Sequence, residues 1–140
     1  MEYRRFGDTL VVRLDPGEEI VEQLLAVAAQ EKIHLAEING LGAVREFTAG
    51  VFRLAEKQFQ GNEFRGEFEI VSLTGTLTEQ DGKPYAHLHM SAGDREGRVF
   101  GGHLSRAVIS ATGEVVVRVL DGRVGRRFDQ EIGLNLFDFQ

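Results

Sequence analysis

Only one stretch of the chain repeats its apolar residues with the period of a helix. These residues fall at positions 20, 24, 25, 27 and 28, which is the spacing of one buried helix face. From position 33 onward, apolar and β-branched residues form short segments separated by turn residues, with Asp81-Gly82 at the centre of a predicted hairpin turn. The pattern predicts an α+β fold, in which one long N-terminal helix packs on a mostly antiparallel sheet.

The limits of this helix are indicated by a few residues on either side of it. Asp15 can accept hydrogen bonds from the first free backbone N–H groups, Pro16 suits the first helical position, and Glu18 completes the spacing of a capping box. The helix is expected to end near Lys32, where a basic side chain suits the helix dipole. Further along, Gly40-Leu41-Gly42 is predicted to be a turn between two strands.

The length and composition of the chain are those of a globular protein. With 140 residues, we expect residues 1–140 to form a single domain. The sequence contains no cysteine, which excludes disulfides and thiolate metal sites. The first residues contain no apolar signal segment, and no apolar run reaches the ~20 residues that span a bilayer. We therefore expect a cytoplasmic protein without a membrane partner.

The charge of the chain disfavours binding to nucleic acid. The formal net charge is −6, whereas a protein that grips phosphates needs a basic face. The basic residues are scattered, apart from Arg4-Arg5 and a group formed by Arg123, Arg126 and Arg127. Short charge runs of this kind are interpreted as solvated surface.

Three of the four histidines lie close together in a predicted hairpin region. His87 and His89 are two residues apart on an expected strand, so their imidazoles project from the same face. The predicted turn at 93–97 would bring His103 back beside them. Three converging imidazoles suit zinc or a similar divalent ion and leave one coordination position open. The alternative is that they are independent polar residues on a solvated sheet face. His34 lies elsewhere in the sequence.

Other chemistry has little support in the sequence. There is no Gly-x-Ser-x-Gly elbow and no phosphate-binding loop, and no cofactor site other than the metal site is expected. Glu37 lies between apolar residues on a predicted strand and could face a pocket, so it is the candidate for a catalytic base. A solvent-facing position on the strand is the alternative for this residue.

Several motifs in order along the chain are similar to those of one known family. Residues 66–76 read Gly-Glu-Phe-Glu-Ile-Val-Ser-Leu-Thr-Gly-Thr and resemble a Gly-x-Phe-Glu-Ile-Leu-Ser-Leu-x-Gly stretch of the PPC domain family, named for plants and prokaryotes. The His-Leu-His segment at 87–89 and the Gly-Gly-His-Leu segment at 101–104 also resemble it. Further similar segments lie at 40–44, 81–84, 97–100 and 128–134. The resemblance covers nearly the whole chain.

The resemblance carries expectations about assembly and binding. It implies a compact α+β domain that assembles as a homotrimer, and it places His87, His89 and His103 on histidine positions suited to a metal. In plants the domain follows an AT-hook, an Arg-Gly-Arg-Pro segment that enters the minor groove of DNA. That segment does not occur in this sequence, so the chain resembles the stand-alone prokaryotic members.

Three functions stay open at this point. The first is a homotrimer that binds zinc or a similar divalent metal and takes a small anion or metabolite at the open coordination position. The second is a DNA-binding, transcription-associated protein, as the family label implies. The third is a metal-dependent hydrolase or lyase acting on a small metabolite, with Glu37 as the base.

Overall fold

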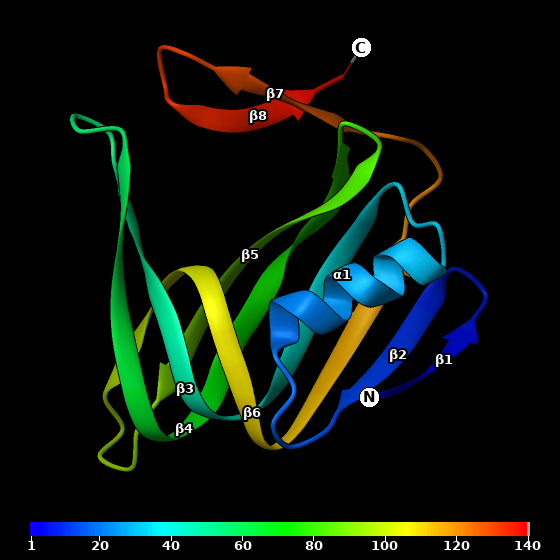
Figure 1. Ribbon diagram of the computed structural model, residues 1–140. Coiled ribbons are helices and arrows are strands. Elements are labelled where there is room, and N and C mark those ends of the chain that lie inside the picture. The colour runs from blue at the N-terminus through cyan, green and yellow to red at the C-terminus, as the bar shows by residue number, and fades with distance from the viewer. Residues whose placement is uncertain (140) are drawn as a thin grey trace.

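The computed structural model describes residues 1–139 and shows a strand-rich molecule with one helix (Figure 1). The elements in chain order are β1 (Glu2–Phe6), β2 (Thr9–Leu14), α1 (Ile20–Gln30), β3 (Ala36–Arg53), β4 (Gln58–Gln80), β5 (Lys83–Gly93), β6 (Val99–Val119), β7 (Gly125–Asp129) and β8 (Leu134–Asp138). Within this described part, no helix has the length and apolar character needed to cross a membrane.

The main sheet is antiparallel and partly closes on itself. Its strand order is β1-β2-β6-β3-β4-β5, and the first part of β6 also pairs with β5. Strands β3, β4, β5 and β6 therefore form a closed ring of pairings, because β3 and β6 are also neighbours. The prediction of a mostly antiparallel α+β fold is confirmed.

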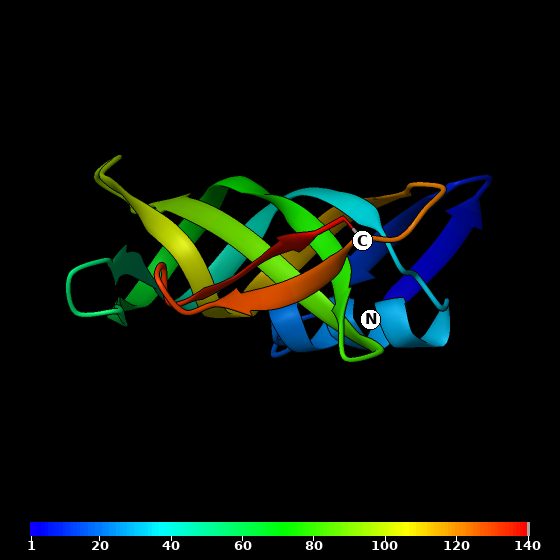
Figure 2. The same cartoon turned by 90° about the horizontal axis from the view of Figure 1, so that it is seen from above.

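The core lies between α1 and one face of this sheet. Ile20, Leu24 and Val27 of the helix are buried, and so are Leu77 and Leu88 on the strands. Because side chains alternate along a strand, burial of Leu88 places His87 and His89 on the opposite face. A separate hairpin, β7–β8, lies across the upper end of the sheet, and the tip of the β3–β4 hairpin projects beside it (Figures 1 and 2).

The prediction of a long helix is wrong, since α1 has 11 residues. The chain turns through Gly17 at φ +89 before the helix begins, and the Asp15 carboxylate binds the Met1 amine and Arg13 instead of capping the helix. The N-cap is Glu19. At the other end Lys32 has a φ of +53, a left-handed conformation that ends the helix.

The buried side chain of Glu19 connects the start of the helix to the sheet. Only 9% of the surface of Glu19 is exposed. One carboxylate oxygen accepts from the backbone N–H of Glu22 at 2.7 Å, and the other accepts from the N–H of Ala107 on β6 at 2.8 Å. The carboxylate thus satisfies donors on two elements that are far apart in the sequence.

Glu19→Ala is expected to lower the free energy of unfolding by about 2 kcal/mol. The change removes a helix cap and leaves the buried Ala107 N–H without its acceptor. Urea unfolding followed by circular dichroism measures the loss. Glu22→Ala, an exposed substitution in the same helical turn, should change stability by less than about 0.5 kcal/mol, and equal losses in both variants would contradict the role of Glu19.

Candidate metal centre

The structure brings His87, His89 and His103 together on the sheet face away from α1. His89 on β5 is the direct register partner of His103 on β6, and His87 lies two residues earlier on β5. Ring centroids are 5.2 Å apart for His87 and His89, 5.1 Å for His87 and His103, and 5.6 Å for His89 and His103. Each ring offers one nitrogen, and these three atoms lie within 4.8 Å of one another.

Glycines allow the strands around these histidines to approach closely. Gly102, next to His103, has a φ of +150, and a Cβ on it would lie 2.4 Å from the carbonyl oxygen of Gly50 on β3. A Cβ on Gly75 would lie 2.0 Å from the carbonyl oxygen of His87. Both distances are well below van der Waals contact, so only glycine fits the observed backbone at either position.

The surroundings of His87 and His103 favour uncharged imidazoles. Burial, together with repulsion from His103, Arg126 and His89, lowers the pKa of His87 to about 4. Burial also lowers the pKa of His103, and repulsion from His89 acts in the same direction. A neutral imidazole is the form that ligates a metal, so both rings are poised as ligands near neutral pH.

The metal-free protein should lose stability as the pH falls from 6.5 towards 4. In this window the folded protein binds fewer protons than the unfolded chain, because the pKa of His87 is 6.5 when unfolded and about 4 when folded. The loss is complete below the folded pKa. An NMR titration of the His87 ring in metal-free protein is expected to give a midpoint near 4. A midpoint close to the ordinary histidine value would contradict the prediction.

A pocket of about 620 Å³ opens over the trio. The sheet supplies the histidines and Tyr85, the β3–β4 hairpin supplies Phe52 and Phe59, and the β7–β8 hairpin supplies Arg126 and Phe137. The ring of Phe59 stands edge-on to His103, with centroids 5.4 Å apart. The histidines therefore form the floor of a mostly apolar pocket, which is a common setting for a ligand site.

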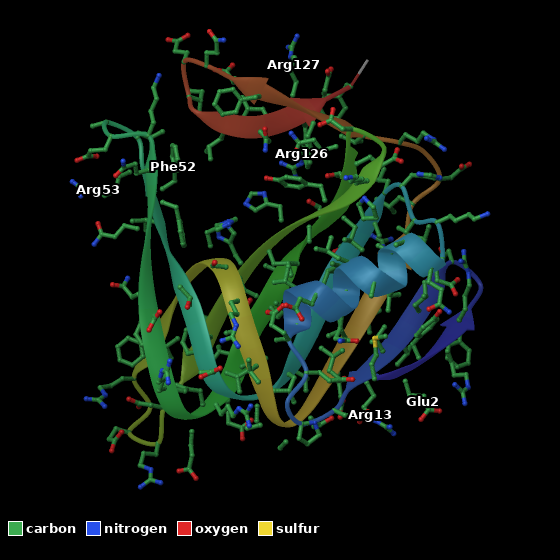
Figure 3. All side chains as sticks on the ribbon, viewed as in Figure 1. Glu2, Arg13, Phe52, Arg53, Arg126 and Arg127 are labelled. Carbon is green, nitrogen blue, oxygen red and sulfur yellow. The ribbon has the colours of Figure 1, made fainter. Side chains whose placement is uncertain are left out.

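Arg126 was not predicted as a pocket residue, and its interpretation as solvated surface is wrong. Its guanidinium carbon lies over the rings of Tyr85 and Phe137, at 4.7 and 4.5 Å from their centroids, and burial lowers the pKa of Arg126. Figure 3 shows Arg126 on the side of the hairpin that faces the sheet, whereas Arg127 lies on the other side. Alternation along a strand implies opposite faces for two adjacent arginines, but the sequence gives no sign of which face is covered.

Glu37 and His34 lie apart from the trio. Glu37 on β3 is opposite Thr76, and Thr76 is opposite His87, so the three side chains share a sheet face. The Glu37 carboxylate is exposed, binds Arg118 at 2.5 Å and does not line the pocket. The Nδ1–H group of His34 donates to the Glu79 carboxylate at 2.6 Å on another part of the surface. The structure thus brings no carboxylate base to the described pocket lining.

Comparison with known proteins identifies similar chains of nearly the same extent. The profile of the Plants and Prokaryotes Conserved (PCC) domain matches residues 1–121. PCC and PPC are two abbreviations for the same family. A candidate DNA-binding protein from Bacteroides thetaiotaomicron has a TM-score of 0.95 at 33% identity, covering 99% of this chain and 96% of that chain. A metal-containing protein from Archaeoglobus fulgidus has a TM-score of 0.86 at 33% identity, covering 97% and 96%. A PPC protein from Pyrococcus horikoshii has a TM-score of 0.86 at 29% identity, covering 99% and 94%.

Longer curated proteins also contain a similar region. The bifunctional protein GlmU of Synechococcus sp. (strain JA-3-3Ab) is 32% identical over 124 residues, which cover 87% of this chain and 19% of that protein. The AT-hook motif nuclear-localized protein 14 of Arabidopsis thaliana is 27% identical over 121 residues, covering 85% of this chain and 28% of that protein. The chain therefore spans less than a third of the length of these relatives.

Proposed function

The chain belongs to the Plants and Prokaryotes Conserved domain family, and from this premise we propose that it binds one divalent metal ion, zinc, through His87, His89 and His103. The convergence of three imidazole nitrogens within 4.8 Å carries the proposal. The similar protein from Archaeoglobus fulgidus, which is described as metal-containing, supports it.

The donor set fits zinc chemically. Zinc holds imidazole nitrogens at about 2.0–2.1 Å, so a tetrahedral site needs them about 3.4 Å apart, and a bound zinc ion would have to draw the three nitrogens together from within 4.8 Å. Three neutral nitrogen donors leave a fourth position for an exogenous ligand. A bound zinc ion would supply positive charge and Lewis acidity at that position.

The metal content of the purified protein tests this proposal. The chain should be produced without a histidine tag, dialysed against zinc-free buffer and measured by inductively coupled plasma mass spectrometry. About one zinc per chain is the expected result, and its removal by a chelator should be reversible. Protein that neither retains zinc nor rebinds it from a slight excess would overturn the proposal.

We also propose that the protein is a homotrimer. Large apolar side chains are exposed on the sheet face away from α1, including Val11 at 48% and Val116 at 44%, which are register partners on β2 and β6. Val71 at 62% and Val99 at 55% are exposed as well. Such a surface is typical of an interface between subunits. Light scattering after size exclusion should give three times the mass of one chain, and the mass of a single chain would overturn the proposal.

DNA binding is a second candidate, supported by the description of the similar Bacteroides thetaiotaomicron protein. In this chain, however, many arginines are paired with carboxylates, as in Arg5 with Glu31, Arg98 with Asp94 and Arg106 with Glu46. Fluorescence anisotropy with an AT-rich duplex at low salt separates the candidates. Binding that weakens steeply with salt would support DNA binding, and a flat series would exclude it.

A further inference from the structure

Arg126 lines the pocket and has no carboxylate partner among the residues that the structure describes. Its Nε donates to the Thr78 hydroxyl at 3.0 Å and its Nη1 to the Asn135 carbonyl at 3.0 Å, and Nη2 lies 3.5 Å from the Thr76 hydroxyl. All three acceptors are neutral. No ion pair joins Arg126 to a carboxylate anywhere in residues 1–139. The guanidinium is thus held by three neutral acceptors, and within residues 1–139 no carboxylate balances its charge.

The hydrogen bonds leave part of the guanidinium available. A guanidinium has five N–H donors, and the three bonds to Thr78, Asn135 and Thr76 leave two of them unused. The guanidinium carbon lies over the rings of Tyr85 and Phe137, and the two unused N–H groups point outward in the guanidinium plane, along its edge. The edge of a fixed guanidinium is the geometry that recognises a planar carboxylate.

The pocket around Arg126 has no acidic residue in its described lining. A divalent metal on the trio would add a second positive centre to the same pocket. Two cations in a partly buried site without an anion are unfavourable, so an anionic ligand would bind with both centres acting in its favour. The charge of the site therefore selects for a negative ligand.

The walls of the pocket define the remainder of such a ligand. They are mainly hydrocarbon, from Val51, Phe52, Phe59, Leu134, Leu136 and Phe137. The volume of about 620 Å³ is that of a site for a small organic molecule. A free phosphate would leave several oxygens against these apolar walls without donors, whereas a carboxylate with an apolar body would bury that body there.

We propose that the pocket binds a small organic carboxylate with an apolar body, and that Arg126 recognises its carboxylate beside the histidine trio. This inference rests on the proposed function in one respect, since the metal supplies the second positive centre. Arg126 is assigned a binding role in addition to the hydrogen bonds to Thr76 and Thr78 by which it connects the hairpin to β4.

The test uses benzoate as the probe and isothermal titration calorimetry as the readout, on zinc-loaded and metal-free protein of residues 1–140. Benzoate is expected to bind the zinc-loaded protein, and neutral benzamide to bind at least about tenfold more weakly, since the charge-assisted bonds are lost. Inorganic phosphate should also bind more weakly than benzoate. These comparisons need no substitution, so they hold even where a variant fails to fold.

Arg126→Met keeps an unbranched apolar stem between Tyr85 and Phe137 and removes the charge. It is expected to weaken benzoate binding by about tenfold or more while the zinc content stays unchanged. Arg127→Met is the matched control, because Arg127 is exposed on the other side of the same strand, and it should leave benzoate affinity unchanged. Thermal unfolding of both variants verifies that the hairpin and sheet are intact.

The outcomes separate this inference from the proposed function. Zinc present without Arg126-dependent benzoate binding would overturn the inference alone. Arg126-dependent benzoate binding to a protein that never holds zinc would support the inference and overturn the proposed metal site. Equal binding of benzamide and benzoate, or tighter binding of phosphate, would overturn the assignment to carboxylates.

Discussion

His89→Ala is expected to abolish stoichiometric zinc binding while the fold is retained. His89 is exposed and its backbone pairing with Thr74 and His103 does not need the imidazole. Removing a group that hydrogen-bonds to a metal-ligating side chain lowers metal affinity by about 10–100-fold. Removing the ligating imidazole itself should lower zinc affinity by at least as much. With free zinc at about one hundred times its Kd, the wild-type protein should gain about 2.7 kcal/mol of stability, and the variant close to none.

Elemental analysis and thermal unfolding with and without zinc measure the two effects. His34→Ala is the matched control, since it removes the one histidine outside the trio, which binds Glu79 and Arg123 instead. The control should retain about one zinc per chain and the full stabilisation. Equal zinc content in wild type and His89→Ala would show that the metal is held elsewhere.

Gly102→Ala is expected to destabilise the protein by about 3 kcal/mol or more. The new methyl group would lie 2.4 Å from the Gly50 carbonyl oxygen, at a φ of +150 that alanine does not readily adopt. Backbone strain and overpacking each cost about 1–3 kcal/mol. Because Gly102 directly precedes His103, any relaxation of β6 away from β3 should also weaken zinc binding in the folded fraction.

Gly97→Ala separates the two causes of this loss. Gly97 has a φ of +79, but a Cβ there meets no atom within 4 Å. Its substitution should cost about 1 kcal/mol from the backbone conformation alone, without an effect on zinc affinity. Chemical unfolding of both variants gives the comparison, and losses of the same size would show that the approach of β6 to β3 contributes nothing.

The sheet and the approach of the three histidines could be predicted because each follows from local rules. Asp81-Gly82 has positive φ at both residues and joins β4 to β5, as the hairpin prediction required. The two-residue period of a strand places His87 and His89 on one face, and the return of β6 alongside β5 brings His103 to His89. Metal binding by this trio stays a prediction.

Glycines account for the main errors within the sheet. Gly40-Leu41-Gly42 is predicted as a turn, but the structure shows a register shift inside the continuous strand β3. A Cβ on Gly42 would lie 2.3 Å from the carbonyl oxygen of Thr112 on β6. The absence of a side chain at Gly42 therefore lets β3 and β6 approach each other closely. A sequence shows that a residue lacks a side chain and does not show whether the chain reverses or only bends.

The helix start and Arg126 could not be predicted because both depend on contacts between distant segments. Glu19 caps the helix through a carboxylate that also binds Ala107, 88 positions away. Arg126 is covered only because its hairpin lies over β4, where Thr76 and Thr78 receive its hydrogen bonds. Neither contact leaves a local pattern in the sequence.

The closed ring of strand pairings formed by β3, β4, β5 and β6 has a consequence for how ligand specificity can change among related proteins. The histidines belong to β5 and β6, which hydrogen-bond each other and also pair with β4 and β3, so they form a rigid frame. Arg126 and Phe137 belong to a hairpin that begins after residue 121, where the family profile ends. The proposed metal site and the proposed ligand contacts of Arg126 and Phe137 thus lie on separate parts of the chain. Replacing the β7–β8 hairpin with one of another sequence should therefore change ligand choice while zinc binding is preserved.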